Sequence, residues 1–594
     1  MIEARFDDLG PTPRSFRLAE PVGVIEARRA DEVANALAAA EGASERGLWA
    51  AGFVAYEAAS GLDPSLAVLA RAHDDPFVDL PLVWFALFEQ REDAALPEPV
   101  DDVQPPPLDE TWLPSVTRER YDRSVERIRE HIAAGDTYQV NYTLRLRARL
   151  EGDERGLYRD LCLAQRGSFG AYLNLGRYRV LSASPELFLR IDRDRILTRP
   201  MKGTAPRGRW AEEDLEHAQA LGASAKDRAE NAMIVDLLRN DLGRVARPGT
   251  VEVPDMFTTE RYETVWQMTS SVVAELRPTT GLVEVFRALF PSGSVTGAPK
   301  VRTMQLIREL EAVSRGVYCG AVGYLAPPGS GEPRANFNVA IRTVMFDAET
   351  GHAEYGVGGG ITHDSRAAAE FDEVLAKARV LAVRRPPFVL IETLRYDRDR
   401  GVADLPLHLR RLSSSADYFG FTYDERRVGD ALDEAVADAM APVRVRVTLA
   451  RDGSVDAVAL PLAEPSSPIR LAIDDVPVDP RDALLFHKTS RRARYDDAAA
   501  RHPEADDVLL VNDRGEATES TIANIAVRLQ GRWFTPPLPS GCLPGTRRAA
   551  LLEDGTLTER VIPVADLRRA DGIALINSTR GWREAVLVDR GAAG

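Results

Sequence analysis

Two adjacent prolines, Pro386 and Pro387, divide this chain of 594 residues into two unequal parts. A helical pattern over residues 366–383 comes before them, and a strand-like run over residues 389–397 follows. Proline lacks a backbone donor and its ring clashes with the preceding helical turn, so a helix cannot continue through the pair. The stretch 384–388 is therefore the predicted boundary between two folded regions joined by a short link.

Helix and strand patterns are mixed in both parts. Residues 118–133 repeat apolar side chains at spacings of four, three and four, which predicts a helix that begins near Thr117 and stops at Gly135. Residues 226–239 also have a helical pattern. Strand-like runs stand at residues 178–191, 318–326 and 443–450. We therefore predict an α/β (α+β) fold in both parts.

A Pro- and acid-rich stretch, residues 92–114, predicts a solvated connection after an N-terminal lobe. Together with the boundary at 384–388, it gives three predicted domains. These are an N-terminal lobe at residues 1–110, a larger domain at 111–385 and a second globular part at 388–594.

Charge and composition exclude several kinds of partner. Acidic side chains number 91 and basic ones 75, a net charge of −16, which argues against nucleic acid because phosphate binding needs a basic face. Small anionic substrates are not excluded, because local arginines or a metal can offset the global charge. No apolar run reaches the roughly 18 residues of a membrane span. The cysteines are isolated and the first residues lack an apolar core, so we expect a cytoplasmic protein.

Two acidic helices carry the first candidate chemistry. Glu370 and Glu373 are three residues apart and share a helix face, and Glu230 lies on the earlier helix. Carboxylates at the edge of an apolar stripe are costly unless they are paired or bind a cation. Mg²⁺ commonly takes one or two protein carboxylates. The alternative is that these glutamates are exposed, with Glu373 paired to Lys377.

A glycine-rich stretch, residues 356–365, precedes the second acidic helix. Its glycines allow close backbone approach to a ligand, and its N–H groups could hold a carboxylate. The alternative is a simple turn. The stretch has neither the dinucleotide fingerprint nor the P-loop pattern, so it gives no support to nucleotide binding.

Eight sequence segments occur in the order found in the chorismate-utilising enzymes, and over residues 121–386 the chain resembles that family. The matching segments are residues 132–143, 182–190, 198–208, 226–245, 290–304, 315–324, 341–343 and 356–373. The resemblance implies a large α/β fold with antiparallel sheets and flanking helices. It implies Mg²⁺ held by Glu230 and Glu373, with Glu370 direct or through water. The implied chorismate-binding residues are Gln139, Thr204, Tyr324, Arg342, Gly358, Gly359 and Gly360.

Three positions discriminate among members of the family. Members that add water to chorismate have a lysine base where this chain has Gln139, so the resemblance implies addition of ammonia. Anthranilate synthases have alanine where this chain has Lys202, and a histidine near Gln267. Lysine at this position resembles aminodeoxychorismate synthase, where it is thought to attack ring carbon C2. An ordinary lysine is protonated at neutral pH, so attack needs desolvation or a nearby cation, and the alternative is a charged Lys202 paired with a substrate carboxylate.

The first reaction also needs a general acid and a source of ammonia. Glu186 resembles the general acid that protonates the departing C4 hydroxyl, since a partly buried glutamate can keep a proton at neutral pH. None of the three cysteines lies in the glycine-rich nucleophile turn of a glutaminase. We therefore expect a separate glutamine amidotransferase subunit to supply ammonia.

The second part resembles the class IV pyridoxal-phosphate enzymes, which include amino-acid aminotransferases and aminodeoxychorismate lyase. Five ordered segments carry the likeness, at residues 405–421, 484–498, 509–525, 533–548 and 576–582. The resemblance implies a two-subdomain α/β fold and bound pyridoxal 5'-phosphate. Lys488 would bind the cofactor covalently, Glu519 would contact the pyridine nitrogen, and Arg411 would bind the phosphate. Ile522, Gly545 and Thr546 would complete the phosphate site. The family usually dimerises, which allows a homodimer through this domain.

Together the two resemblances predict a bifunctional enzyme. The first part would convert chorismate and ammonia to 4-amino-4-deoxychorismate, and the second would eliminate pyruvate to give 4-aminobenzoate for folate, with Lys488 removing the C4 proton. One rival hypothesis keeps the synthase but makes the second part an amino-acid aminotransferase. A second is an anthranilate synthase-like enzyme, and a third is an arylamine supplier to secondary metabolism. A fourth makes the second part only a scaffold.

Overall fold

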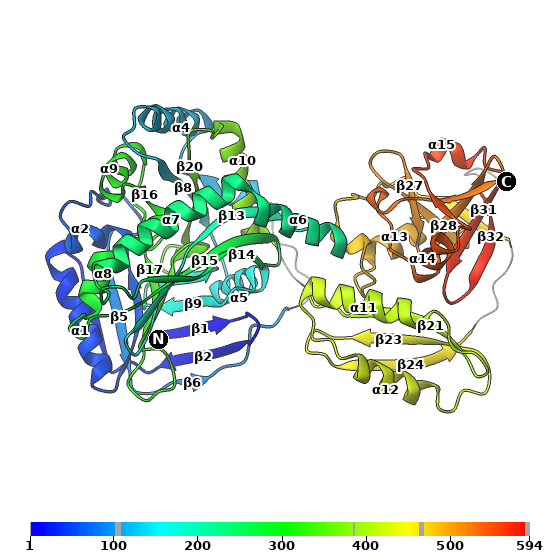
Figure 1. Ribbon diagram of the computed structural model, residues 1–594, viewed down its shortest axis with the longest axis horizontal. Helices are drawn as coiled ribbons and strands as arrows, with labels where there is room; N and C mark the ends of the chain where they lie inside the picture. Colours follow the sequence, from blue (N-terminus) through cyan, green and yellow to red (C-terminus); the bar gives the residue numbers. More distant parts are fainter. Residues whose placement is uncertain (1, 101–107, 384–385, 463–467, 589–594) are drawn as a thin grey trace. The chain divides into compact units, whose positions relative to one another are not determined.

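The computed structural model describes residues 2–100, 108–383, 386–462 and 468–588. The chain forms two compact units (Figure 1). The first contains residues Met1–Pro206 and Ala218–Pro386, and the second contains Arg207–His217 and Pro387–Gly594. Part of the connection expected over residues 92–114, and residues 384–385 of the expected boundary, lie outside the described residues.

Two ten-stranded sheets form the first unit. The first sheet has, in spatial order, β16 (Gly297–Ala298), β8 (Gln139–Arg149), β20 (His352–Ile361), β19 (Thr343–Asp347), β10 (Tyr178–Ser184), β9 (Phe169–Asn174), β1 (Glu3–Asp8), β2 (Arg14–Ala19) and β6 (Glu92–Asp93), and β7 (Leu113–Pro114) also pairs with β8.

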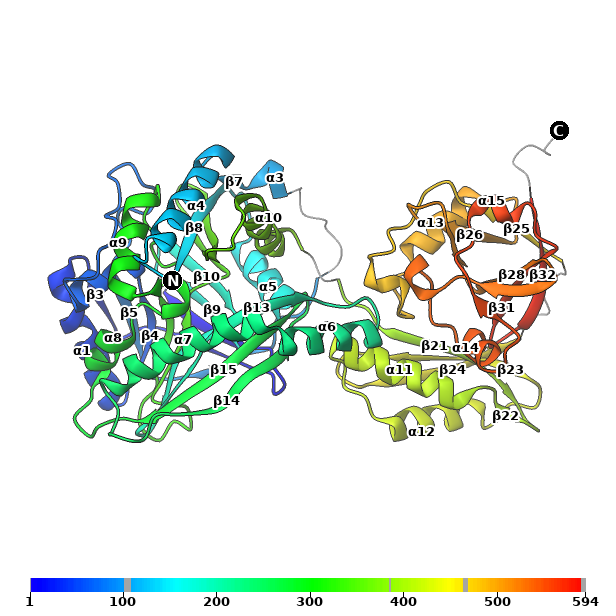
Figure 2. The same ribbon diagram turned by 45° about the horizontal axis from the view of Figure 1, so that its top comes forward.

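The second sheet of this unit has β13 (Met201–Pro206), β15 (Val265–Glu275), β12 (Arg195–Arg199), β11 (Leu187–Asp192), β18 (Ala335–Val339), β17 (Ala321–Leu325), β4 (Trp49–Val54), β5 (Val83–Phe88) and β3 (Gly23–Ala27). Strand β14 (Glu252–Arg261) lies beside β15 (Figure 2). The strand pairs in both sheets are antiparallel, as the sequence predicted.

The strands alternate between two buried faces. On β9, Ala171 and Leu173 join the core between the sheets, whereas Tyr172 faces the helices outside the first sheet. On β4, Phe53 faces the core between the sheets and Val54 faces the opposite side. This period of two buries both faces of each sheet.

Helices cover the outer faces of the two sheets. The first sheet packs against α4 (Arg118–Ala133), α5 (Glu154–Gln165), α9 (Lys300–Leu310) and α10 (Ala367–Ala378). The second packs against α1 (Val33–Glu45), α7 (Ala225–Gly243) and α8 (Leu282–Leu289). Two short helices, α2 (Ala59–Leu62) and α3 (Leu108–Thr111), complete the unit.

The structure confirms the first two predicted helices and refines the third. Helix α4 spans the predicted residues, and the hydroxyl of Thr117 accepts a hydrogen bond from the backbone N–H of Arg120. Helix α7 contains the predicted 226–239 and is capped by Ser224. The third, expected over 366–383, ends as an α-helix at Ala378 and continues as a 3₁₀ turn.

One expected strand is two strands. The run at residues 178–191 breaks at Pro185, so β10 lies in the first sheet and β11 in the second. The return passage occurs between β18 and β19, where Arg342 adopts a positive φ of 52°. Backbone hydrogen bonds join the two passages, from the N–H of Val339 to the carbonyl of Glu186 and from that of Ala183 to the carbonyl of Arg342. These passages fix Glu186 and Arg342 where the two sheets meet.

The second unit has a small and a large sheet. The small antiparallel sheet has the order β22 (Gly401–Val402), β21 (Leu390–Asp397), β23 (Val443–Leu449) and β24 (Val455–Pro461). The large sheet has β27 (Ala517–Ser520), β26 (Asp507–Val511), β25 (Ile469–Ile473), β32 (Gly581–Leu587), β31 (Gly572–Asn577), β28 (Asn524–Leu529), β29 (Arg532–Thr535) and β30 (Thr558–Glu559).

Helices α11 (Leu405–Phe419) and α12 (Glu425–Val436) pack on the same face of the small sheet (Figure 2). That face carries Leu390, Leu394 and Val445. The opposite face carries Ile391, Thr393 and two arginines of β23, and it lines a cavity. The remaining helices are α13 (Ala493–Arg501), α14 (Thr546–Glu553) and α15 (Val564–Leu567).

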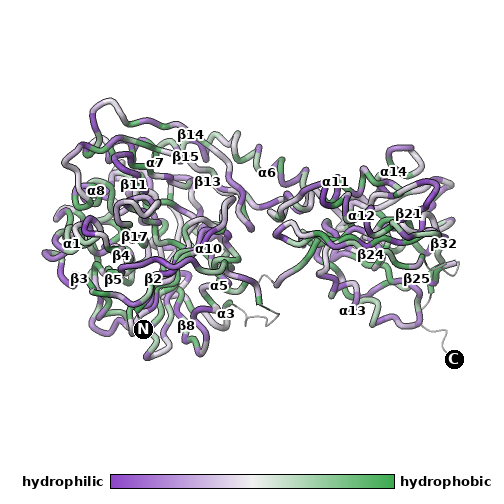
Figure 3. Tube along the Cα trace, turned by 90° about the horizontal axis from the view of Figure 1, so that it is seen from below, coloured by the Kyte–Doolittle hydropathy of each residue, from purple (hydrophilic) through white to green (hydrophobic). Residues whose placement is uncertain are grey.

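Helix α6 (Ala211–Ala223) begins in the Arg207–His217 segment of the second unit. Hydrophilic and hydrophobic residues interleave along α6 and α7 in Figure 3. Within the described part of the chain, no helix has the length and apolar character needed to cross a membrane.

Candidate functional sites

The glycine-rich stretch, residues 356–365, is strand as far as Ile361 and contains a turn beyond it. Gly358, Gly359 and Gly360 lie in β20 and pair with β8. A Cβ atom on Gly360 would lie 2.0 Å from Nε2 of Gln139 and 3.0 Å from Nζ of Lys202. A side chain at position 360 would therefore displace the ends of the Gln139 and Lys202 side chains.

The same strand also meets the predicted acidic helix. A Cβ atom on Gly359 would lie 3.3 Å from Oε2 of Glu370 and 3.8 Å from Oε1 of Glu373. The carbonyl of Gly358 accepts a hydrogen bond of 2.9 Å from Nζ of Lys377. Two adjacent glycines thus let residues from β8, β13 and α10 approach the same end of β20.

Gln139 and Lys202 have unusual surroundings for polar side chains. Gln139 is 1% exposed, and its Oε1 atom is buried with no hydrogen-bond partner in the described structure. Desolvation lowers the pKa of Lys202. Glu230 opposes this shift by attraction, and Lys377 adds to it by repulsion. The site therefore offers an unsatisfied acceptor beside a lysine that burial drives toward its neutral form.

Glu186 occupies the passage between the two sheets and is 3% exposed. Burial raises the pKa of its carboxyl to about 7, although the attraction of Lys202 favours the charged form. The hydroxyl of Ser294 donates a hydrogen bond of 2.6 Å to its Oε1. A carboxyl with this pKa can exchange a proton at neutral pH.

The three predicted metal-binding glutamates lie on α7 and α10. Burial raises the pKa of Glu230 and of Glu370, and the negative charge of Glu373 raises both further. Burial also tends to raise the pKa of Glu373, but the ammonium of Lys377, 2.6 Å from its carboxylate, holds that pKa below the ordinary value.

This donor set fits a hard divalent cation, because mutually repelling carboxylates are stabilised by bound positive charge and Mg²⁺ needs only one or two of them. Within the described residues, however, no three His, Cys, Asp or Glu side chains converge as a metal-binding group. The three glutamates are therefore not gathered into one preformed cluster.

The other predicted chorismate-binding residues divide into two groups. Arg342 donates a hydrogen bond to the carbonyl of Lys377, the residue whose Nζ donates to the carbonyl of Gly358. Thr204 lies on β13 with Lys202, and its hydroxyl donates to Oε1 of Gln267 over 3.1 Å. Tyr324 is not at this place.

The ring of Tyr324 lies within 6 Å of Phe6, Phe16 and Trp49, and its hydroxyl donates to Glu332. It lines a separate cavity of about 180 Å³. The prediction that Tyr324 joins the chorismate-binding residues is therefore wrong, because its strand points the ring into the core between the sheets. Sequence reasoning missed Ser294 as the partner of Glu186.

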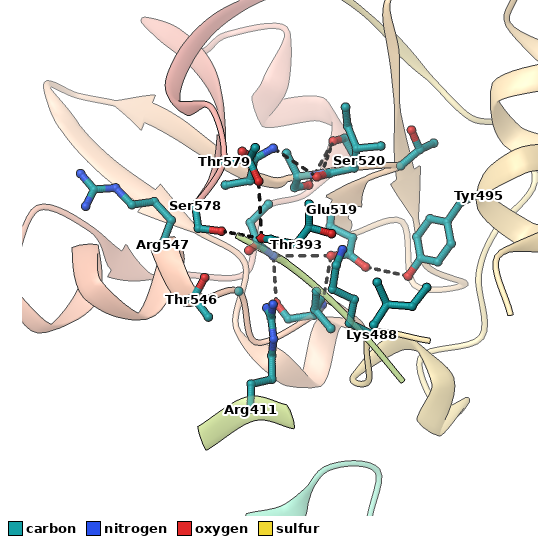
Figure 4. Close-up of a pocket in the computed structure, with 18 of the residues that line it drawn as sticks. Thr393, Arg411, Lys488, Tyr495, Glu519, Ser520, Thr546, Arg547, Ser578 and Thr579 are labelled. Carbon is teal, nitrogen blue, oxygen red and sulfur yellow. Dashed lines mark hydrogen bonds between the residues drawn. The ribbon is translucent and has the colours of Figure 1, made fainter. Parts of the chain in front are cut away.

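The second unit contains a larger cavity of about 330 Å³ (Figure 4). Lys488, Glu519 and Arg411 all line it, together with Ile522, Gly545 and Thr546. The structure therefore brings together all six cofactor-site residues predicted for this part. They come from α11, the loop before α13, β27 and its following turn, and the start of α14.

Lys488 lies in an extended segment fixed to the small sheet. Its carbonyl accepts a hydrogen bond from the N–H of Ile391, and Thr489 forms a bridge with Leu390. Burial lowers the pKa of the Lys488 ammonium to about 8, and Arg411 contributes to the shift. About a tenth of the amine is therefore neutral at pH 7, far more than for an ordinary lysine.

Glu519 is 4% exposed, and burial raises its pKa to about 7. The hydroxyl of Tyr495 donates a hydrogen bond of 2.8 Å to Oε1 of Glu519 (Figure 4). The backbone N–H of Leu543 donates to Oε2 over 3.1 Å. These contacts hold one carboxylate against the cavity, where it can pair with a protonated ring nitrogen.

Arg411 forms a bidentate ion pair with Glu392, with hydrogen bonds of 2.8 and 2.6 Å. Burial alone would raise the pKa of Glu392, but Arg411 and His408 outweigh it and hold that pKa at about 2. Helix α14 begins beside the cavity, and helix N-termini attract phosphate. The lysine, the carboxylate, the guanidinium and this helix terminus fit the parts of pyridoxal 5'-phosphate.

The charge of the cavity wall was not anticipated from the sequence beyond Arg411. The cavity is lined by Arg411, Arg444, Arg446, Arg491, Arg492, Arg547 and Arg580, with Glu519 as the only acidic residue among the described lining. Nε of Arg444 is buried without a hydrogen-bond partner in the described structure. We call these seven arginines the arginine wall. Arg444 and Arg446 are two residues apart in a strand and so share one face, which is the sequence signal that could have predicted part of it.

The fold of the first unit and the site beside Gly358–Gly360 of β20 agree with the family to which this part of the chain is similar. Residues 12–383, more than half of the chain, match the chorismate binding enzyme family, and the chain belongs to that family. Residues 389–588 match the amino-transferase class IV family. The prediction of a fusion, and of both fold types, is confirmed.

Two curated relatives match the first unit. The chain is 43% identical over 270 residues to aminodeoxychorismate synthase component 1 of Klebsiella aerogenes, covering 46% of this chain and 58% of that protein. It is 39% identical over 279 residues to anthranilate synthase component 1 of Aquifex aeolicus, covering 47% and 55%. The matches thus span less than two thirds of each relative.

A solved structure agrees with the fold of this unit. Anthranilate synthase component I from Streptococcus pneumoniae aligns with a TM-score of 0.54 and 26% identity, over 63% of this chain and 93% of that one.

Proposed function

We propose that the chain makes 4-aminobenzoate in two steps. The first unit converts chorismate and ammonia to 4-amino-4-deoxychorismate and water, and the second splits this product into 4-aminobenzoate and pyruvate. The observation that carries the proposal is the position of Lys202 and Gln139 at Gly360. An amine and an amide, rather than a base for water, stand at the centre of a chorismate-binding fold.

The residues of the first unit take distinct roles. Lys202, as a neutral amine, attacks ring carbon C2, while the protonated Glu186 gives its proton to the departing C4 hydroxyl. Ammonia adds at C4 and displaces Lys202 from the ring, so the lysine is regenerated. The buried Oε1 of Gln139 supports this role, because it can accept a hydrogen bond from ammonia.

Substrate and metal binding complete this site. Arg342, Thr204 and the backbone of Gly358 to Gly360 bind the carboxylates of chorismate. Glu230 and Glu373 hold Mg²⁺, with Glu370 direct or through water. When bound, the ion supplies positive charge that stabilises the carboxylates of the substrate.

Ammonia comes from a separate glutamine amidotransferase subunit. Such enzymes need a reactive thiolate, and all three cysteines here are buried. Burial raises the pKa of Cys319 to about 11 and that of Cys542 to about 12, and it raises the pKa of Cys162 further. These thiols are unsuited to attack glutamine, which supports an external source.

The second unit holds pyridoxal 5'-phosphate through Lys488, Glu519 and Arg411, with Ile522, Gly545 and Thr546 at the phosphate. When bound, the cofactor withdraws electrons from the carbon attached to the substrate nitrogen. Lys488 removes the C4 proton from the substrate, the ring becomes aromatic and pyruvate leaves. The arginine wall supports this substrate, because 4-amino-4-deoxychorismate carries two carboxylates and an ordinary amino acid often carries one.

We further propose that the enzyme works in the cytoplasm, supplies folate synthesis and dimerises through its second unit. Three buried, unpaired cysteines fit a reducing compartment.

The test is an incubation of the purified protein with chorismate, ammonium, Mg²⁺ and pyridoxal 5'-phosphate, followed by mass spectrometry of the products. We expect equal amounts of 4-aminobenzoate and pyruvate. Anthranilate as the main product would overturn the proposal for the first unit. Synthesis of 4-amino-4-deoxychorismate without its cleavage, together with keto-acid formation from an added amino acid, would make the second unit an aminotransferase.

A further inference from the structure

The second unit includes a short segment taken from within the sequence of the first. Residues Arg207–His217, here called the inserted segment, belong to the second unit, whereas the residues on both sides of it belong to the first. The segment directly follows β13, the strand of Lys202. None of the steps proposed above uses it.

The inserted segment packs against the residues that precede Lys488. The ring of Trp210 lies 5.0 Å from that of Phe486, and the guanidinium of Arg209 lies 5.6 Å from the same ring. Arg209 also donates a hydrogen bond of 3.2 Å to the carbonyl of Pro480. Phe486 is 1% exposed, so Trp210 and its neighbour form part of the covering of a fully buried side chain two residues from the lysine.

A second line of contacts reaches His487, the residue next to Lys488. The His487 ring is buried against the ring of Tyr418 on α11, 4.4 Å away. The hydroxyl of Tyr418 donates a hydrogen bond of 2.7 Å to the carbonyl of Gly208. The guanidinium of Arg207 lies 4.3 Å from the Tyr418 ring and donates to the Tyr418 carbonyl. The segment therefore supports the tyrosine that packs on His487.

The inserted segment is internally braced. Arg207 and Asp214 form a bidentate ion pair with hydrogen bonds of 2.8 and 2.7 Å, and both side chains are 7% exposed. The N–H of Gly208 donates to the same carboxylate over 2.8 Å. A Cβ atom on Gly208 would lie 2.1 Å from the backbone N of Asp214, so the turn closes tightly. A braced segment can hold a neighbour in place at little further entropic cost.

Phe486, His487 and Lys488 are consecutive, and the last two line the cavity. We propose that the inserted segment positions Lys488, by forming the wall behind the loop that carries it. Trp210 and Tyr418 are then positioning residues that act through Phe486 and His487. The part of this inference that concerns cofactor binding rests on the proposed function, whereas the part that concerns the loop does not.

The test uses the full-length protein with four substitutions. Trp210→Ala removes the contact with Phe486, and Trp210→Phe keeps an aromatic ring. Tyr418→Phe removes only the hydroxyl that donates to Gly208. Glu216→Gln, an exposed position of α6, is the matched control.

Two readouts are measured for each variant. The first is hydrogen–deuterium exchange of the peptide covering residues 484–498, without added cofactor. The second is the dissociation constant of pyridoxal 5'-phosphate, with the pH at which the absorbance of the bound cofactor changes.

We expect Trp210→Ala to speed exchange in that peptide and to weaken cofactor binding about tenfold, with a shifted pH midpoint, because small displacements of a reacting group are costly. Trp210→Phe should restore most of the affinity, Tyr418→Phe should show a smaller loss, and Glu216→Gln should match the parent protein. Circular dichroism tests whether Trp210→Ala is folded, and if it is not, Tyr418→Phe decides.

Unchanged exchange, affinity and pH midpoint in folded Trp210→Ala and Tyr418→Phe proteins would overturn the inference. If the parent protein binds no pyridoxal 5'-phosphate, the proposed function of the second unit fails. The exchange data alone then decide whether the inserted segment holds the loop.

Discussion

Lys202 and Lys488 are both lysines whose pKa is lowered chiefly by desolvation, but their strongest charged neighbours differ. Lys202 lies among carboxylates, with Glu230 and Glu186 both favouring its protonated form. Lys488 lies in a cavity whose wall carries seven arginines. The strongest charge effect on the pKa therefore has opposite signs at the two lysines, attraction by Glu230 at Lys202 and repulsion by Arg411 at Lys488.

This difference indicates where each amine gets its reactivity. Around Lys488, Arg411 adds to desolvation and outweighs the attraction of Glu392, so the net shift of the pKa is toward the neutral amine without a metal. Around Lys202 the carboxylates work against desolvation. On the proposed function, a divalent cation bound to Glu230 and Glu373 would offset the attraction that these two carboxylates exert on the Lys202 ammonium. The first amine would thus depend on metal, and the second would not.

The largest expected effect comes from removing the second lysine. Lys488→Ala should lower 4-aminobenzoate formation by at least about 10³-fold, because both the cofactor link and the proton acceptor are lost. Chorismate should still be consumed, and 4-amino-4-deoxychorismate should accumulate in the chromatogram. Arg481→Ala, whose side chain is 80% exposed, is the control. Normal 4-aminobenzoate formation by Lys488→Ala would exclude this role.

Changing the first lysine should separate its two candidate roles. Lys202→Ala should reduce chorismate amination about 10²- to 10³-fold, measured as chorismate consumption with ammonium. Lys202→Arg keeps the positive charge but lacks a nucleophilic amine. Equal loss in both variants supports attack on the ring, and retention of activity by Lys202→Arg would leave only a carboxylate-binding role.

The metal dependence of the first site gives the next effect. Glu373→Gln should raise the Mg²⁺ concentration needed for half-maximal chorismate amination about 10- to 100-fold. Its exposed neighbour provides the matched variant, Asp372→Asn. The cofactor-dependent second reaction, assayed separately on 4-amino-4-deoxychorismate, should not change with Mg²⁺. Equal shifts for the two variants would show that Glu373 has no special role.

The pH dependence of the first reaction should report Glu186. The general acid must carry its proton, and burial raises the pKa of this carboxyl to about 7. At a fixed concentration of free ammonia, the kcat/KM for chorismate should therefore fall about tenfold per pH unit above pH 7, where Glu186 loses its proton. Glu186→Gln should be slow and lack this descending limb. A profile of the parent protein that stays flat from pH 6 to 9 would rule the assignment out.

The smallest expected effect concerns the arginine wall. Arg444→Gln should raise the KM for 4-amino-4-deoxychorismate about tenfold, because a charge-assisted hydrogen bond to a carboxylate is lost. The kcat should change little, since Arg444 takes no part in proton transfer. Arg427→Gln on α12, whose side chain is 64% exposed, is the comparison. An unchanged KM would remove Arg444 from the substrate site.

Sequence reasoning found the parts of each site that motifs carry. Gly360, Gln139 and Lys202 are separated by more than 60 residues in each case, yet the structure brings them together as the resemblance implied. The helix of Glu370 and Glu373 was also accessible, because helical spacing is local information.

What sequence reasoning missed depends on contacts between distant elements. Tyr324 stands in a family motif, but the pleat of β17 turns its ring away from the site. Ser294 reaches Glu186 only because the chain crosses between two sheets at Pro185. Arg444 and Arg446 of β23 can be assigned to one site only once the structure shows that their face of the sheet lines the cavity. No local sequence pattern predicts these contacts between distant residues.

The membership of Arg207–His217 in the second unit has a consequence for dividing this protein. A gene cut between Pro386 and Pro387 would give a C-terminal fragment without Trp210, and Phe486 would lose the indole packed against it. The two units are therefore interleaved in the sequence rather than joined in simple succession. To separate them, the eleven residues Arg207–His217 would have to be transferred to the C-terminal fragment, because a single cut leaves the second unit incomplete.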